Sequence, residues 1–139
     1  MQYDFVSAFD EPHIEQLFEL YQREWWSSQR RPSDVRAMLS ASDLVFGFLE
    51  RDTGQLAAFS RVLTDFVYKA LVFDVIVAEP HRGRGLGRRL LETIVNHPRL
   101  HPVQHVELYC RPNLVGFYRK FGFTEELGDL TFMRREQKA

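Results

Sequence analysis

The stretch "ALVFDVIVAEPHRGRGLGRRLLETIV", residues 70–95, decides the fold of this chain. Its first nine residues are almost all apolar, as expected of a central strand that is covered on both faces. Residues 80–89 then hold three glycines and four arginines, and a helical pattern of leucines follows. Because a helix start favours acidic side chains, this concentration of arginine indicates that the loop binds an anion.

The segments on either side predict an α/β fold, a mixed sheet with helices on its faces. Hydrophobic periodicity and turn residues give the order strand, helix, helix, three strands, helix, strand, helix and two strands. The 70–110 region supplies a parallel crossover. The expected strands cover 3–9, 44–50, 56–63, 70–78 and 105–110, with a closing hairpin over 123–136. Two helices are expected to begin at caps Asp10 and Ser33. A third is expected to begin at Leu86, after the loop, and a fourth to cover 114–121.

Length and composition limit the classes of protein that fit. With 139 residues, the chain suits one domain, residues 1–139. A net charge of −1 gives no field that would recruit nucleic acid or an anionic membrane. A single cysteine, Cys110, and five histidines without metal-ligand spacing give no reason to expect a metal. The lack of a signal or spanning segment predicts a soluble, cytoplasmic protein.

The glycine-rich loop does not match the two commonest phosphate-binding loops. A Walker A loop needs a Gly-Lys-Ser/Thr string, which the chain lacks. A dinucleotide fingerprint needs a third glycine where Arg88 stands. The pattern that remains is Arg82-x-x-Gly85-x-Gly87, placed between a strand and a helix, where free backbone N–H groups can bind phosphate.

This loop, together with a second segment, resembles the Gcn5-related N-acetyltransferases, the GNAT superfamily. The loop is similar to that family's R/Q-x-x-G-x-G/A motif, and "NLVGFYRKFGF", residues 113–123, is similar to its N…FYxKxGF segment. The predicted order of elements also agrees over nearly the whole chain. The resemblance implies the GNAT fold, acetyl-CoA as cofactor, and a splay between the strands at 70–78 and 105–110.

The resemblance also implies which residues bind acetyl-CoA. Backbone N–H groups of Arg82 to Gly87 would hold the CoA pyrophosphate, and Arg84 and Arg88 would add charge-assisted bonds. The end of the strand before the loop would pair with the pantetheine arm as another strand would. These cofactor residues are Val75, Ile76, Val77, Arg82, Gly83, Arg84, Gly85, Leu86, Gly87, Arg88 and Asn113.

Two residues are candidates for catalysis, Tyr118 and Asp74. Tyr118 matches the family tyrosine whose hydroxyl lies near the CoA sulfur, which implies a general acid. Asp74 interrupts an apolar strand, where burial would raise its pKa and suit a general base. The alternative is a structural carboxylate bound to backbone or to an arginine such as Arg61. Glu24, Asp65 and a water relay without a dedicated base are further alternatives.

The acceptor side is less defined by the sequence. On the first helix, the side chains of Trp25 and Trp26 are expected to diverge by about 100°, and Phe66 and Tyr68 lie in a later turn. All four are candidate substrate-binding residues. The alternative for the tryptophans is a place in the core. Cys110 is expected to be a small buried side chain rather than a nucleophile.

The predicted function is transfer of an acetyl group to a primary amine of a small molecule or peptide by direct attack. The alternative is an acyl-CoA-binding sensor without turnover. Dimers are common in the family, so the resemblance leaves a homodimer open.

Overall fold

The computed structural model describes residues 2–137, in which an open sheet carries the helices. The strands are β1 (Tyr3–Val6), β2 (Leu44–Glu50), β3 (Leu56–Thr64), β4 (Lys69–Val77) and β5 (His105–Glu107). The helices are α1 (Glu11–Gln22), α2 (Pro32–Ala41), α3 (Leu86–Val95) and α4 (Val115–Arg119), with short 3-10 turns η1 (Glu79–His81), η2 (Pro98–Leu100) and η3 (Pro112–Leu114).

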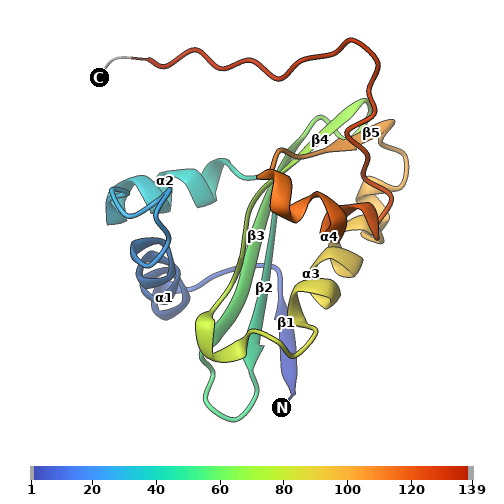
Figure 1. Cartoon of the computed structure of the whole chain (residues 1–139). Helices are drawn as coiled ribbons and strands as arrows, with labels where there is room; N and C mark the ends of the chain where they lie inside the picture. Colours follow the sequence, from blue (N-terminus) through green and yellow to red (C-terminus); the bar gives the residue numbers. More distant parts are fainter. Residues whose placement is uncertain (1, 138–139) are drawn as a thin grey trace. The chain divides into compact units, whose positions relative to one another are not determined.

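The sheet has the strand order β1-β2-β3-β4-β5. Neighbours are antiparallel from β1 to β4, whereas β4 and β5 are parallel. Figure 1 shows α1 and α2 on one face of this sheet and α3 on the other. The mixed α/β fold and the parallel crossover through α3 that the sequence predicts are therefore confirmed.

Each helix-covered face has its own apolar packing. On the α1–α2 face, Leu17, Tyr21 and Val35 pack on Phe59 and Ile76 of the sheet. On the other face, α3 buries the four apolar side chains that its helical spacing puts on one side. They are Leu86, Leu90, Leu91 and Ile94.

The first helix begins as predicted and the second does not. The Asp10 carboxylate accepts the His13 backbone N–H at 3.1 Å, and Pro12 lies in the first turn of α1. The second helix starts at Pro32 instead, with Arg31 as its N-cap and no side-chain cap bond. Ser33 therefore lies inside α2, because a proline at the first position already sets the helical φ.

Strand β4 has an irregular position at Asp74. This residue adopts φ +58, in the left-handed region that few residues other than glycine adopt. The register between β3 and β4 shifts at the same place, between the Phe59–Ile76 pair and the Arg61–Phe73 pair. A bulge of this kind re-aims a side chain, and here it directs the Asp74 carboxylate to the α1–α2 side.

Strand β5 accompanies β4 over only three pairs, Lys69–His105, Ala70–Val106 and Leu71–Glu107. The second half of β4, from Val72 onward, pairs with β3 on one edge and has no β5 partner on the other. This is the splay that the family resemblance implies.

Three predicted strand regions differ from the structure. The first strand ends at Val6 because Phe9 turns back and packs its ring on Gly47, where a Cβ would approach the ring to 2.6 Å. The strand at 105–110 ends at Glu107, where β4 diverges. Residues 123–137 form neither helix nor strand and make only local turn bonds, so the structure does not contain the closing hairpin.

The chain divides into two compact units, Met1–Leu108 and Tyr109–Ala139. The first contains the sheet with α1, α2 and α3, and the second contains η3 and α4. Within residues 2–137, no helix combines the length and apolar character needed to cross a membrane.

Candidate active site

The loop between β4 and α3 presents unusually many backbone donors. Gly83 and Gly85 adopt φ +76 and +77, conformations that suit glycine, and a Cβ on either would meet nothing within 4 Å. The first helical bond of α3 runs from the Arg89 N–H to the Gly85 oxygen at 3.1 Å. In the described chain, no protein acceptor is found for the N–H groups from Gly83 to Arg88.

This donor set begins one residue later than the sequence suggests. The Arg82 N–H donates to the Glu79 oxygen at 3.2 Å and is therefore not available to a ligand. The Arg82 side chain is also engaged, with the Val77 oxygen at 2.9 Å and with Glu24 at 3.3 Å. Arg82 thus shapes the loop from within, and the amides from Gly83 to Arg88 that follow it have no acceptor in the described chain.

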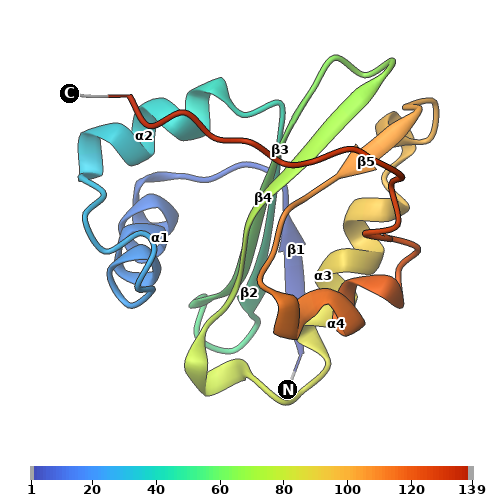
Figure 2. The ribbon, with the colours of Figure 1, turned by 45° about the horizontal axis from the view of Figure 1, so that its top comes forward.

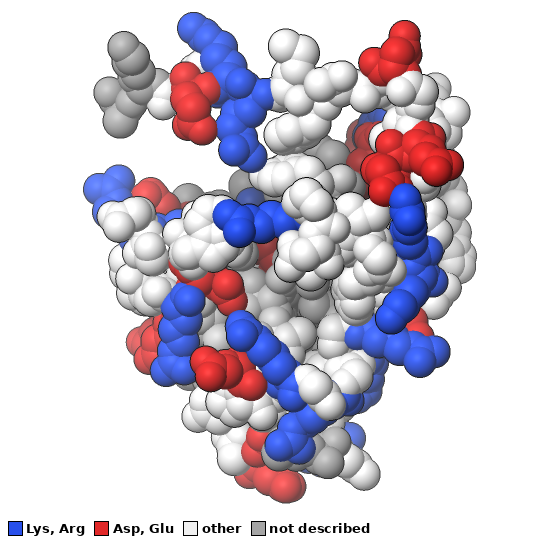
Figure 3. Space-filling model, viewed as in Figure 1, with Lys and Arg blue, Asp and Glu red and all other residues white. Residues whose placement is uncertain are grey.

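The other loop arginines differ in their partners. Arg88 pairs with Glu92 at 2.8 Å, one turn along α3. Arg89 lies over the Phe48 ring at 4.8 Å. Arg84 is exposed, and no ion pair or hydrogen bond of its side chain is found among residues 2–137. In Figure 3, basic side chains group toward the end of the molecule where the β4–α3 connection lies in Figure 1.

The open edge of β4 lies directly before this loop. Val75 to Val77 continue past the last β5 pair, so one edge of this segment is not covered by a strand. Ile76 is buried, whereas Val75 and Val77 are half-buried. A ligand with an anionic end and an amide-containing arm therefore fits the loop and the strand together.

Asp74 lies in a cluster of three donors. Its Oδ2 accepts from the Tyr21 hydroxyl at 2.8 Å, Arg30 Nη1 at 2.9 Å and Arg61 Nε at 2.8 Å. The Asp74 side chain is only 7% exposed, so the three bonds form in a largely desolvated place. The three donors come from α1, the α1–α2 connection and β3, which the bulge at Asp74 brings together.

The electrostatics of this cluster oppose a general base at Asp74. Burial alone would raise the pKa of the carboxyl group, but the hydrogen bonds and charges of Arg30 and Arg61 outweigh it, so the pKa is lowered. The raised pKa that the sequence predicts is therefore wrong. The arrangement corresponds to the alternative, a structural carboxylate bound to arginine, and Arg61 is one of its partners.

The Tyr21 hydroxyl is the third member of the cluster. Its burial, followed by the negative charge of Asp74, raises the pKa of the phenol, so Tyr21 stays protonated and donates to Asp74.

The other two candidate bases are also engaged. Asp65 accepts the backbone N–H groups of Val67, Tyr68 and Lys69 at 2.8, 2.7 and 3.1 Å, and these bonds lower its pKa. Glu24 pairs with Arg82. Asp65 therefore stabilises the β3–β4 turn, and Glu24 joins the α1–α2 connection to the loop.

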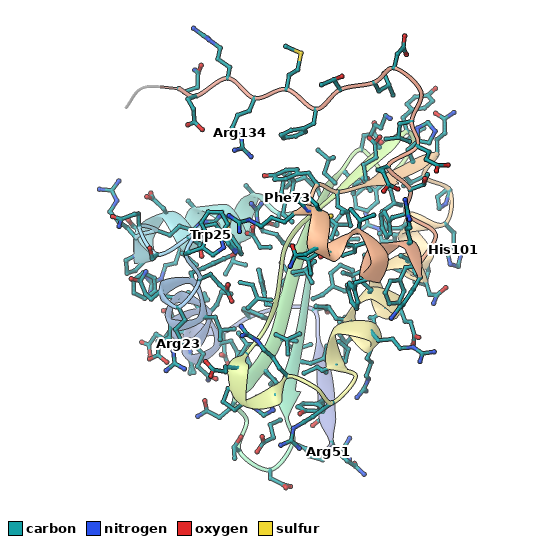
Figure 4. All side chains as sticks on the ribbon, in the orientation of Figure 1. Arg23, Trp25, Arg51, Phe73, His101 and Arg134 are labelled. Carbon is teal, nitrogen blue, oxygen red and sulfur yellow. The ribbon has the colours of Figure 1, made fainter. Side chains whose placement is uncertain are left out.

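The two tryptophans lie in a turn rather than on a helix. Since α1 ends at Gln22, Trp25 and Trp26 belong to the connection to α2, where Figure 4 labels Trp25. They are 69% and 38% exposed, so neither belongs to the core. Trp26 contacts Tyr21 edge-on at 6.1 Å and receives the Arg30 guanidinium over its ring at 5.3 Å.

Arg30 could not be recognised as a site residue from the sequence. Its position in "SSQRRPS" reads as a polar linker, and no local signal connects it to a strand 44 residues away.

The aromatic pair Phe66 and Tyr68 lies elsewhere. Both residues belong to the tip of the β3–β4 hairpin, which Figure 2 shows directed away from α1. Six residues of extended strand, about 20 Å, separate Tyr68 from Asp74. Phe66 adopts φ +61 and carries the Arg99 guanidinium 3.8 Å from its ring centre. The structure therefore does not bring this pair to the tryptophans.

The second motif lies in the second unit. Tyr118 is buried on α4, and its ring contacts Phe117 and Phe123 edge-on. Burial, followed by the charge of Cys110, raises the pKa of Tyr118 to about 12. Asn113 is exposed on η3. Cys110 is exposed rather than buried as expected. Partial burial, followed by the charge of Glu125, raises the pKa of its thiol, which makes it a poor nucleophile at neutral pH.

Comparison with known proteins gives a family match. A profile of the acetyltransferase (GNAT) family matches residues 12–123. The chain is 33% identical over 115 residues to serotonin N-acetyltransferase 2, chloroplastic, of Oryza sativa subsp. japonica, covering 79% of this chain and 58% of that protein. It is 40% identical over 96 residues to glucosamine 6-phosphate N-acetyltransferase 1 of the same plant, covering 65% and 58%. The chain thus spans somewhat more than half the length of these curated relatives.

Solved structures show the same fold. A GNAT-family protein from Xanthomonas campestris pv. campestris superposes with a TM-score of 0.80 at 28% identity, covering 96% of this chain and 94% of that one. Glucosamine-6-phosphate N-acetyltransferase from Arabidopsis thaliana superposes with a TM-score of 0.73 at 16% identity, covering 96% and 99%.

Proposed function

Because this chain belongs to the acetyltransferase (GNAT) family, we propose that it transfers an acetyl group from acetyl-CoA to a primary amine of a small molecule or peptide. The observation that carries the proposal is the row of amides from Gly83 to Arg88, which have no acceptor in the described chain, beside an open strand edge. Both features fit CoA, which has a pyrophosphate at one end of an amide-containing arm.

The loop and β4 would bind the two parts of the cofactor. The amides of Gly83 to Arg88, at the start of α3, hold the pyrophosphate, and the positive end of the helix dipole adds to their effect. Arg84 adds a charge-assisted bond from its uncommitted guanidinium. The open edge at Val75–Val77 pairs with the arm, and Asn113 is the proposed contact from the second motif. Bound acetyl-CoA supplies an acetyl group activated as a thioester.

Tyr118 is the proposed general acid at the leaving sulfur. With a pKa of about 12, its hydroxyl is protonated throughout the physiological range and available as a donor. An ordinary thiol has a pKa of about 8.5, so complete proton transfer to the thiolate would be uphill by roughly 5 kcal/mol. As general acid, Tyr118 therefore shares its proton with the departing thiolate through a hydrogen bond, without transferring it completely.

We propose that solvent accepts the proton that the attacking amine loses. Asp74 has a lowered pKa and accepts three hydrogen bonds, and Asp65 is held by three amides. Neither carboxylate is suited to accept a proton near neutral pH. We assign Asp74 a structural role, that of fixing Tyr21, Arg30 and Arg61 on the acceptor side.

Trp25 and Trp26 are the proposed acceptor-binding aromatics, since both are exposed and Trp26 contacts Tyr21 of this cluster. The relatives named for serotonin and for glucosamine 6-phosphate act on chemically different amines, so their names support a small amine acceptor without choosing one.

We also propose the extent of the domain and the cellular location of the protein. We treat residues 1–139 as one acetyltransferase domain, since the family profile crosses both compact units. A cytoplasmic location is retained as a proposal, although two relatives are named as chloroplastic. A homodimer is one assembly to be tested by light scattering.

Two measurements test the proposed function. Isothermal titration with acetyl-CoA and CoA should show binding, and a thiol-release assay with a panel of amines should show turnover. Absence of binding at high micromolar cofactor would refute the proposal. Binding without thiol release from any amine would favour the alternative, a non-catalytic acyl-CoA-binding sensor.

A further inference from the structure

The cluster around Asp74 contains more positive than negative charge. Two arginines, Arg30 and Arg61, share one carboxylate, and they are the charged groups that act on the pKa of Asp74. Tyr21 is neutral because its raised pKa keeps the phenol protonated. The nearby Glu24 is paired with Arg82 and does not balance the excess. The cluster thus carries one positive charge that no carboxylate in the described chain balances.

The excess charge is accessible at Arg30. Its side chain is 31% exposed, compared with 13% for Arg61 and 7% for Asp74. The hydrogen bonds described for its guanidinium, to Asp74 Oδ2 at 2.9 Å and Met38 Sδ at 3.6 Å, both use Nη1. No buried side-chain nitrogen in the described residues lacks a partner, so the remaining N–H groups of Arg30 reach solvent. They are free to bind a ligand.

Arg30 is also held in a fixed orientation. Its guanidinium carbon lies 4.5 Å from the centre of the Tyr21 ring and 5.3 Å from that of Trp26. The backbone of the connection is fixed by bonds from Arg30 N to the Ser27 oxygen and from Gln22 Nε2 to the Arg30 oxygen. A guanidinium that is already oriented loses little entropy when it binds a carboxylate or a phosphate in the plane of its N–H groups.

We propose that Arg30 is a specificity-determining residue that binds an anionic group, a carboxylate or a phosphate, carried by the amine acceptor. This inference rests on the proposed function, because it assigns a class of acceptor to the same site. Asp74 holds one side of the guanidinium, the rings of Tyr21 and Trp26 flank it, and the free N–H groups meet the anion. The acceptors favoured by this arrangement are amines with an acidic group, rather than polyamines.

The alternative is that Arg30 only stabilises the fold through Asp74. That role requires one ion pair, which Arg61 already supplies from within the sheet at 2.8 Å. A second arginine adds charge that must be balanced, and burying unbalanced charge costs free energy. Keeping Arg30 partly exposed, beside two exposed tryptophans, suits ligand binding better than packing.

Matched acceptor pairs test the inference. L-tryptophan and L-tryptophanamide differ in a carboxylate, and glucosamine 6-phosphate and glucosamine differ in a phosphate. For the wild type, kcat/KM should be at least about tenfold higher for the anionic member of one pair. The pair that shows this preference identifies the anion as a carboxylate or a phosphate. In Arg30→Gln this preference should fall to about unity through a higher KM, with the CoA affinity unchanged. Arg30→Lys should retain part of it, since lysine keeps the charge but not the planar fork.

A control variant and a direct measurement of amine binding complete the test. Arg23→Gln removes an exposed arginine of the same connection and should leave the preference unchanged. Titration of the same four amines into the CoA complex measures the preference without turnover, so a failure of catalysis does not hide it. Equal binding and equal rates for both members of each pair in the wild type would overturn the inference. A preference that persists in Arg30→Gln, folded as judged by circular dichroism, would do the same.

Discussion

Two arginine-rich regions of this protein break a local rule, and they do so in opposite ways. The β4–α3 loop has arginines where a helix start favours acids, and its N–H groups from Gly83 to Arg88 have no acceptor in the described chain. The Asp74 cluster has a left-handed backbone in a central strand, yet its carboxylate accepts bonds from three neighbours. The loop amides have no acceptor in the described chain, whereas the Asp74 carboxylate has three donors, and the unbalanced charge of the cluster lies at Arg30.

The difference indicates what each region does. Unsatisfied donors on an exposed loop contribute nothing to folding and become useful only when an anion binds. Satisfied donors around a buried carboxylate fix the positions of α1, the α1–α2 connection and the sheet. Substitutions in the loop should therefore change cofactor binding, whereas loss of the Asp74 carboxylate should change stability.

The strongest test of the loop is Gly85→Glu. The new side chain places bulk and negative charge where the pyrophosphate is proposed to bind, so the CoA affinity should fall at least a hundredfold in isothermal titration. Gly54→Glu is the matched control, since Gly54 also has a positive φ, +72, with nothing within 4 Å of an added Cβ. Equal losses of affinity in both variants would mean that backbone strain, not the anion site, causes the effect.

The corresponding test of the cluster is Asp74→Asn. It leaves Arg30 and Arg61 without their counter-charge, and the free energy of unfolding should fall by about 3 kcal/mol, the lower part of the range for a broken buried pair. Urea denaturation measures this loss. Asp4→Asn, which breaks an exposed pair with Arg51, should have little effect.

The loss of stability in Asp74→Asn should also depend on pH. The pKa of Asp74 is lowered on folding, so its contribution to stability is present above the unfolded pKa of about 3.9 and is lost as the pH falls through the lower, folded value. The difference in stability between wild type and Asp74→Asn should stay constant from pH 5 to 8 and shrink below about pH 4. A difference that grows toward low pH would contradict the lowered pKa.

Tyr118→Phe separates binding from chemistry. Loss of the hydroxyl should lower kcat by about ten- to a hundredfold, with little change in the CoA affinity. Because the pKa of Tyr118 is about 12, the ratio of wild-type to variant rates should not vary with pH between 6 and 9. Tyr109→Phe, at an exposed tyrosine of the same unit, is the control. Unchanged turnover in Tyr118→Phe would exclude Tyr118 from the mechanism.

The smallest effect distinguishes two arginines of the loop. Arg84 has no ion pair in the described chain, whereas Arg88 is bound to Glu92. Arg84→Gln should therefore weaken CoA binding by about three- to tenfold, and Arg88→Gln by less. Titration at low and high salt measures both, and the Arg84 contribution should decrease with salt. A larger loss for Arg88→Gln would mean that CoA displaces Glu92.

Much of the fold could be predicted because its signals are local. The strand from 44 to 50 and the helix capped by Asp10 depend on periodicity and on residues within one turn. The ends of β1 and β5 could not, since they depend on Phe9 meeting Gly47 and on where β4 diverges. The bulge at Asp74 also has no local signal other than the presence of a carboxylate in an apolar strand.

The candidate site, like the fold, could be predicted only where its signals are local in sequence. The glycine loop was visible because its spacing is contiguous, although the first amide of the predicted set, that of Arg82, proved to be engaged with Glu79. Arg30 was missed because its importance depends on Asp74, far away in sequence. The direction of the Asp74 pKa was wrong for the same reason, since burial was evident from the strand but the second arginine was not.

The short pairing between β4 and β5 has a consequence for how fast a ligand can enter. A cleft that opens only by separating two paired strands must first break their hydrogen bonds, and the rate of binding then depends on that opening step. Here the strands part after Leu71 and Glu107, so no β4–β5 pairing has to break before a ligand meets the backbone groups of Val75 to Val77. The frequency of collision, rather than the opening of paired strands, should therefore limit the association rate.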